Sequence, residues 1–342
     1  MAYTTINNPT IYFNTKLYTG TGSSNALTGV GFQPDWVWIK RRSATANHRT
    51  LDSVRGSTKE IYPNLTNSEQ TFTGISSFNS DGFTLATADG SYNLNSATYV
   101  AWNWKGGGAA SSNSNGSITS SVSANTSAGF SIVSYTGTGS TATVGHGLGV
   151  APDVIIVKNR EDSNSWNVYH VGNAGATPAE DFVIYLDQTT AKTNQASNWN
   201  DTAPTSSVFT VGSSNGSNGS SDDMIAYCFS AVEGYSKFGS YKGNGLSSGT
   251  FVFTGFRPAW VLVKNISTAY SWDLNDNKRD PHNVCEKVLS PNLSDAEATA
   301  TSMDFLSNGF KLRVNNNSQN RSGDTFIYLA FAESPFKYSR AR

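Results

Sequence analysis

The sequence predicts an all-β protein made of three tandem copies of a β-sandwich domain of about 100 residues, with short helical turns. Three observations lead to this prediction. One pattern of glycines, a proline and apolar runs occurs three times along the 342 residues. Charged residues make up only 14% and glycines number 31, which is typical of short strands joined by tight turns. Aromatic residues reach 12%, so the chain carries the apolar side chains that a disordered chain lacks.

The repeated pattern starts with a Tyr-x-Gly-x-Gly step and continues into a proline, an apolar run and a lysine. In all three copies the lysine lies six positions after the proline, and a ring side chain lies fourteen positions after the same proline. The period is 117 and then 106 residues, which is too long for a solenoid unit of about 20–50 residues. The fold-defining positions are Pro34, Pro152 and Pro258 with Lys40, Lys158 and Lys264, and the ring positions are His48, Trp166 and Trp272.

Each copy contains the same predicted elements in order. The run after the proline is apolar on both faces, as in a strand packed between layers. Asp81-Gly82 and Asn308-Gly309 are hairpin-turn dipeptides. Residues 64–69 and 292–297 carry a Thr/Ser-x-x-Glu capping pattern, which predicts a short helix in each. About six strands in roughly 100 residues favour a sandwich over a meander.

The spacing of the copies predicts the domain boundaries. We expect an extended N-terminal arm at residues 1–11, the first sandwich at 12–104, a flexible linker rich in Gly, Ser and Asn at 105–128, the second sandwich at 129–232 and the third at 233–342. Because no comparable linker separates the second and third copies, the expected arrangement is one hinged domain beside a closely packed pair.

Composition also limits the function. A net charge of −1 without a basic cluster argues against nucleic acid as a partner. Two cysteines, Cys228 and Cys285, do not make a disulfide framework. The first residues lack a basic start and an apolar stretch, and no run approaches the ~18 apolar residues of a membrane span, so we expect synthesis in a cytoplasm without a signal peptide or membrane insertion.

The recurring residues also resemble a known family. The pattern from Tyr18 to Lys40, the step at 52–56, and the stretches 78–85, 99–105 and 331–337 are similar to an uncharacterised repeat domain of tail-fibre-like virion proteins of tailed phages, many of them marine. The resemblance covers residues ~10–342. It implies a location in the virion and no defined activity.

Motifs of enzymes are weak in this chain. Gly-x-Ser-x-Gly occurs at 212–216 and 245–249, but in Gly- and Ser-rich turns without a strand-to-helix context. The four histidines show no zinc spacing, and the acidic run 273–277 lacks the glycine and closing glutamate of a calcium loop. Paired carboxylates for glycoside hydrolysis need not be close in sequence, so they stay an open alternative. We assign no catalytic residue, metal ligand or cofactor.

Two alternatives stay open for the ring positions and for the function. His48, Trp166 and Trp272 are candidate contacts to a ligand or partner, although packing in the core or at an edge is favoured; the three lysines are expected where each strand reaches solvent. The expected function is a tail-associated adhesin that contacts the host surface. The alternative is a capsid or tail decoration protein with a purely structural role, and a polysaccharide-degrading enzyme is a distant third. Expected partners are other virion proteins, a host-surface glycan or protein, and further copies in a trimer.

Overall fold

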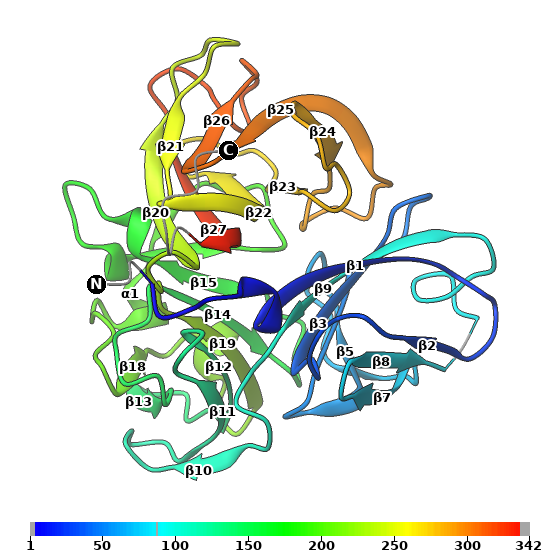
Figure 1. Ribbon diagram of the computed structural model, residues 1–342. Coiled ribbons are helices and arrows are strands. Elements are labelled where there is room, and N and C mark those ends of the chain that lie inside the picture. The colour runs from blue at the N-terminus through cyan, green and yellow to red at the C-terminus, as the bar shows by residue number, and fades with distance from the viewer. Residues whose placement is uncertain (1–3, 87, 336–342) are drawn as a thin grey trace.

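The computed structural model describes residues 4–86 and 88–335 and is all-β, with six antiparallel sheets in these residues (Figure 1). The first three residues of the expected arm and the last seven of the expected third sandwich lie outside the described residues. We call residues 12–104, 105–232 and 233–335 the first, second and third segments. Figure 1 shows them as three lobes, blue to cyan, green, and yellow to red.

The strands of the first segment are β1 (Phe13–Thr19), β2 (Asn25–Leu27), β3 (Trp36–Arg41), β4 (Arg49–Asp52), β5 (Gly56–Ile61), β6 (Gln70–Thr71), β7 (Ile75–Asn79), β8 (Gly82–Leu85) and β9 (Thr98–Trp104). Those of the second are β10 (Ser111–Asn113), β11 (Ser120–Asn125), β12 (Phe130–Thr136), β13 (Ala142–Gly145), β14 (Val154–Asn159), β15 (Asn167–His170), β16 (Phe182–Tyr185), β17 (Thr193–Asn194), β18 (Val208–Val211) and β19 (Asp223–Phe229). Those of the third are β20 (Ser236–Lys242), β21 (Phe251–Phe253), β22 (Phe256–Asn265), β23 (Asp273–Asp276), β24 (Cys285–Val288), β25 (Ala298–Leu306), β26 (Gly309–Leu312) and β27 (Thr325–Pro335).

Helical structure is confined to single turns. The 3₁₀ turns are η1 (Pro9–Ile11), η2 (Val171–Asn173) and η3 (Ala179–Asp181), and the α-helical turns are α1 (Ala196–Trp199) and α2 (Asn215–Asn218). Short helical turns were expected, but the two turns predicted at 64–69 and 292–297 are wrong, because neither range is helical. Their glutamates, Glu69 and Glu297, bind arginines instead of capping a helix. No helix in the described residues is long and apolar enough to cross a bilayer.

One sheet in each segment repeats the same strand order. The orders are β1-β9-β3-β4, β12-β19-β14-β15 and β20-β27-β22-β23. The register is also the same: the residue two positions after the repeated proline pairs with the aromatic that closes the segment, as Trp36↔Trp104, Val154↔Phe229 and Trp260↔Phe331. The strand predicted after each proline is therefore present, and its apolar faces are buried in all three places.

A second sheet lies over each of these sheets, with fewer strands in the first two segments and the same number in the third. Its strand orders are β2-β8-β7, β13-β18 and β21-β26-β25-β24. The predicted hairpins β7–β8 and β25–β26 are both present. Separate apolar clusters occupy the three segments, each with side chains from both of its sheets. This arrangement of two sheets around a local core is typical of sandwich architecture.

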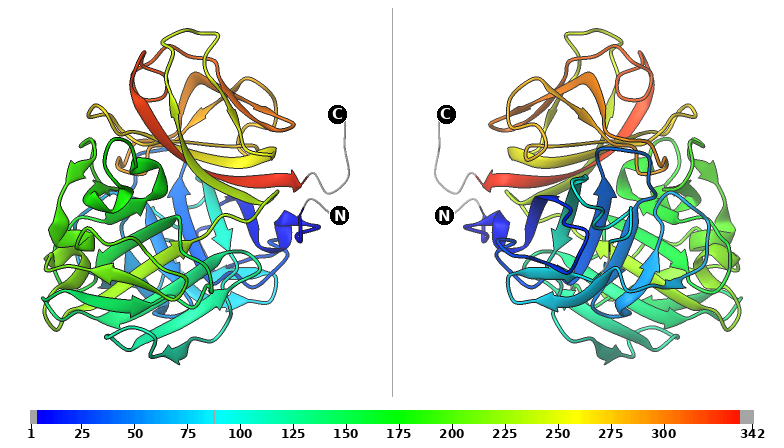
Figure 2. Two further views of the ribbon diagram at one scale, coloured as in Figure 1. Left: turned by 90° about the vertical axis from the view of Figure 1, so that its left-hand side faces the viewer. Right: turned by 90° about the vertical axis from the view of Figure 1, so that its right-hand side faces the viewer.

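The three segments share one further core at the centre of the molecule. Its buried residues come from all three segments and from Ile6 of the N-terminal arm. The closing aromatics meet there: the ring centroids of Trp104 and Phe331 lie 5.8 Å apart, those of Phe229 and Phe331 5.9 Å, and those of Trp104 and Phe229 6.5 Å. The two side views show the yellow-to-red lobe lying directly against the other two (Figure 2). The expected hinged first domain is therefore wrong.

The expected linker is structured. Residues 105–128 contain β10 and β11, which extend the sheet of the second segment next to β12. The glycines allow close packing here: a Cβ on Gly107 would lie 2.3 Å from the carbonyl oxygen of Ala124. The Ser123 hydroxyl accepts a hydrogen bond from the Gly107 amide at 3.0 Å and donates one to the Gly108 carbonyl at 2.7 Å. Composition typical of a flexible linker thus serves a tight backbone contact.

Candidate functional site

The buried charged and hydrogen-bonding side chains at the recurring positions lie at the junctions between segments. The repeated lysines are fully buried, so the expectation that they mark where strands reach solvent is wrong. Each ammonium donates a hydrogen bond to a main-chain carbonyl of another segment. The three pairs are Lys40 to Ser294 at 3.1 Å, Lys158 to Thr66 at 3.1 Å and Lys264 to Thr189 at 3.0 Å.

The ring positions lie at the same junctions. The indole Nε1 of Trp166 donates to the carbonyl of Tyr62 at 2.9 Å, and that of Trp272 donates to the carbonyl of Tyr185 at 3.0 Å. His48 accepts from Nε1 of Trp38 at 2.9 Å and lies beside the main chain of Ser290. All three rings are buried, which is the packing role that the sequence favoured and which leaves them closed to an external ligand.

These contacts follow a cyclic order. The lysine and ring of the first segment contact the third, those of the second contact the first, and those of the third contact the second. Each segment therefore gives the same face to one neighbour and receives it from the other. A chain with this pattern closes on itself, as subunits do in a cyclic oligomer.

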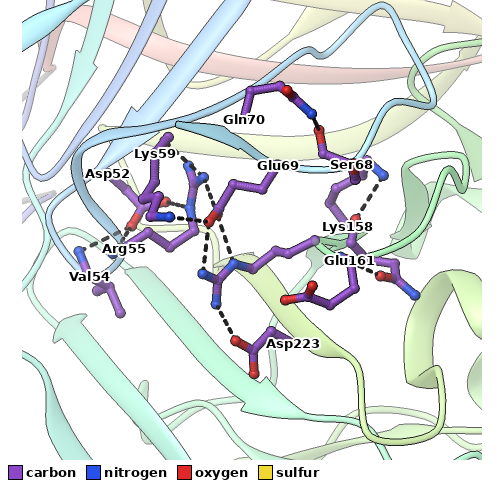
Figure 3. A network of polar contacts seen from close by, with 12 residues as sticks. Asp52, Val54, Arg55, Lys59, Ser68, Glu69, Gln70, Lys158, Glu161 and Asp223 are labelled. Carbon is purple, nitrogen blue, oxygen red and sulfur yellow. Dashed lines mark hydrogen bonds and ion pairs between the residues drawn. The ribbon is translucent and has the colours of Figure 1, made fainter. Parts of the chain in front are cut away.

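An ion-pair network occupies the junction of the first and second segments (Figure 3). Glu69 accepts hydrogen bonds from Nε and Nη2 of Arg160 at 2.8 and 3.0 Å and from Nη1 of Arg55 at 3.0 Å. Asp52 binds Nε of Arg55 at 2.6 Å and accepts a hydrogen bond from the Tyr227 hydroxyl at 2.7 Å. The second segment thus binds the first through Arg160 and Tyr227.

The junction of the first and third segments repeats this network with other residues. Glu297 pairs with Nε of Arg42 at 2.8 Å and with Nη1 of Arg279 at 3.2 Å. Asp276 pairs with Nε of Arg279 at 2.5 Å and accepts a hydrogen bond from Nε1 of Trp102 at 3.0 Å. Arg42 and Arg160 stand at the same place in the repeat, eight positions after their prolines.

The junction of the second and third segments replaces ions with neutral groups. Ile266 stands at the place of Arg42 and Arg160 and is buried. His170 and Asn173 stand at the places of Asp52 and Arg55. Nε2 of His170 lies 3.1 Å from the Tyr328 carbonyl and Nδ1 accepts from the Gly172 amide at 2.9 Å, which fits a neutral ring that donates through Nε2. Cation and anion are therefore lost together at this junction.

Burial and charge set the protonation of these groups. Burial lowers the pKa of Lys40, Lys158 and Lys264 to about 8. Burial also lowers the pKa of His170 to about 4. Burial acts to raise the pKa of Glu69, but hydrogen bonds from Arg160 and the charge of Arg55 outweigh it and hold that pKa below its usual range. The junction carboxylate is thus ionised at neutral pH, as an ion-pair partner must be.

The other sequence motifs take structural places. Ser214, in the middle of one Gly-x-Ser-x-Gly match, caps α2 by accepting from the Gly216 amide at 3.3 Å. The first four residues of the acidic run 273–277 form β23, and the Asp276 carboxylate is paired with Arg279. No group of three or more His, Cys, Asp or Glu that could hold a metal occurs among residues 4–86 and 88–335.

The sequence interpretation missed the junction acids and arginines. A signal was present, because Asp-x-x-Arg occurs at 52–55 and again at 276–279 at matching places in the repeat. The sequence could not show which arginine of another segment pairs with Glu69, because that arginine, Arg160, is 91 positions away.

A family model described as "Domain of unknown function (DUF7483)" matches residues 8–335. This one model spans all three segments together rather than a single segment. No curated protein matches the chain.

Proposed function

We propose that this chain, which belongs to the DUF7483 family of domains of unknown function, is a non-enzymatic structural and adhesive protein of a virus particle. In this proposal it is associated with the tail and contacts the host surface. Its partners are other virion proteins and a host-surface glycan or protein. The resemblance of its repeated residues to tail-fibre-like proteins motivates the location.

We further propose that the three segments are diverged copies of one β-sandwich. The shared strand order, the shared register at Trp36, Val154 and Trp260, and the cyclic order of the lysine contacts support this origin. On this view the chain is a single-chain counterpart of a cyclic trimer. Duplication then let the three junctions diverge separately, two toward ion pairs and one toward neutral contacts.

One observation favours a binding role over a catalytic role. The lysines and rings at recurring places are buried, the junction acids are buried or partly buried, and these groups bond to a neighbouring segment. Their role is to hold a rigid body together. Recognition then falls to the surface loops and sheet edges, which a rigid scaffold positions well.

Labelled antibody against this chain, applied to purified particles and viewed by electron microscopy, tests the location. Label on the tail supports the adhesin. Particles that carry no label, although the same antibody detects the purified chain, would contradict a virion role.

A second candidate is a decoration protein that attaches to the capsid or tail tube. The exposed apolar side chains of Phe251 and Phe253 favour it, because such a surface suits contact with another protein. Label on the head in the same experiment assigns this role. Cleavage of host polysaccharide above background by the purified chain, abolished by replacing a single Asp or Glu, would contradict both candidates.

A further inference from the structure

The third segment exposes an unusual concentration of apolar side chains. Leu246 is 60% exposed, Phe251 43% and Phe253 53%. The two phenylalanines lie on β21, which is the edge strand of the sheet β21-β26-β25-β24. Alternation along the strand points both outward while Val252 faces the core. Edge strands that are exposed and apolar are ready to pair with another chain.

The fold does not require phenylalanine at these two places. Leu27, Val144 and Val252 are matching residues, because they pair with Phe83, Phe209 and Phe310 respectively. The positions flanking Leu27 are Ala26 and Thr28, and those flanking Val144 are Thr143 and Gly145. The first and second segments thus form the same edge strand with small or polar residues.

The matching edge of the second segment is covered by its own chain. The Ile118 amide donates to the Thr143 carbonyl at 3.0 Å, and Ser117 exchanges hydrogen bonds with Thr143 at 2.8 and 2.9 Å. A parallel bridge joins Ile118 to Val144. In the described part of the chain no strand lies on the outer side of β21. The edge that carries the two phenylalanines is therefore uncovered, as is β2 of the first segment, which lacks the phenylalanines.

The main chain of β21 has bonding groups available on that side. The Thr250 carbonyl accepts from Leu312 and the Thr254 amide donates to Asn308, so the even-numbered positions face β26. In an antiparallel ladder the positions between them face the opposite way. The amides and carbonyls of Phe251 and Phe253 therefore point outward, away from the sheet.

The sequence of this edge reads the same in both directions: Thr250-Phe251-Val252-Phe253-Thr254. We propose that β21 pairs antiparallel with β21 of a second copy of this chain, across a twofold axis at Val252. Phe251 then lies opposite Phe253 of the second copy and exchanges both main-chain hydrogen bonds with it. The phenylalanine side chains form cross-strand aromatic pairs on one face, and a self-complementary patch of this kind is what a twofold interface requires.

The contact is small, so the dimer is weak in solution. A single strand pair buries far less than the ~1,200 Å² of a standard interface. We expect a dissociation constant in the micromolar to millimolar range. Many copies on one particle would raise the local concentration and make such a contact effective.

Sedimentation equilibrium from about 1 μM to 1 mM tests the association. The average mass should rise with concentration from 36.6 kDa toward the dimer. Replacing both phenylalanines by threonine (Phe251→Thr and Phe253→Thr), the residue found at matching positions 143 and 28, should raise the dissociation constant at least about tenfold. Val150→Thr, at a residue 54% exposed elsewhere, is the control and should change nothing. A chain that stays monomeric, or a double variant that dimerises like the parent, would overturn the proposal.

Cysteine cross-linking tests the register. Paired positions in this ladder hold their Cα atoms about 5.5 Å apart, which suits a disulfide. A Phe251→Cys chain mixed with a Phe253→Cys chain should therefore cross-link faster than either chain alone, while native Cys228 and Cys285 are buried. Equal rates would contradict the twofold at Val252. A parent chain that stays monomeric but whose Phe251 and Phe253 amides become protected from exchange with a host glycan or another virion protein would assign the edge to that partner and overturn self-pairing.

Discussion

At the scale of single residues, many buried and partly buried polar groups of this chain form hydrogen bonds or ion pairs with a neighbouring segment. Glu69 is the clearest case, since it is shared by Arg55 of its own segment and Arg160 of the next. Removing Glu69 would cost about 1.5–3 kcal/mol, because a partly buried side chain loses its hydrogen bonds to charged arginines. The junction of the second and third segments has no such ion pair, because the buried Ile266 stands where the other two junctions have an arginine.

His170 makes one junction sensitive to acid. Its pKa is about 4 in the folded chain because of burial, against about 6.5 when unfolded. Between these values the unfolded chain binds the proton and the folded chain does not, so His170 lowers stability as the pH falls from 6.5 to 4. The expected loss is about 3 kcal/mol.

Chemical unfolding of the parent and of His170→Asn at several pH values from 4 to 7 measures this effect. The difference between their free energies of unfolding isolates His170 from the other titrating groups, and it should shift against the parent as the pH falls. His282→Asn, at an exposed histidine, is the control and should follow the parent. Parallel curves for the parent and His170→Asn would contradict a neutral buried ring.

At the scale of elements, the sequence predicted strands well and their surroundings poorly. The strand after each proline and the hairpins before Phe83 and Phe310 depend on local pattern, and they are present. The spacing also singled out Lys40 and His48. It could not show that these side chains are covered, because the covering residues belong to another segment more than 200 positions away.

The prediction of a flexible linker at 105–128 was wrong for a related reason. Gly and Ser predict flexibility when nothing packs against them. Here Ala124 approaches Gly107, and the Ser123 hydroxyl bonds the main chain of Gly107 and Gly108, so the same composition forms two strands. The candidate site was missed for the same reason. Asp52 and Arg55 can be recognised as part of a junction only from their contacts with Tyr227 and Glu69, which the fold brings close.

Proteolysis distinguishes a linker from this packed edge. A broad protease that cuts within the exposed stretch 109–117 should leave the pieces associated, because Trp104 and Phe229 stay buried in the common core. Size-exclusion chromatography of the nicked chain should match the intact chain, while a denaturing gel shows two fragments. Release of a fragment of about one third of the mass in native buffer would support independent domains instead.

At the scale of the whole molecule, the three segments behave as one body. The closing aromatics Trp104, Phe229 and Phe331 touch one another, and the lysine contacts run around the ring in one direction. The family model supports the same unit, since it spans residues 8–335. A segment removed from this arrangement would expose its share of the central core to water.

Calorimetric unfolding of the intact chain and of Glu69→Gln tests this unity most directly. We expect one transition for the parent, with calorimetric and van't Hoff enthalpies in agreement. Glu69→Gln should move that single transition to lower temperature as a whole, by the loss of about 2 kcal/mol of hydrogen bonds to charged groups at one junction, while Glu161→Gln, at an exposed residue nearby, leaves it in place. Two or three separate transitions in the parent, or a Glu69→Gln variant in which only part of the heat absorption shifts, would contradict a shared core.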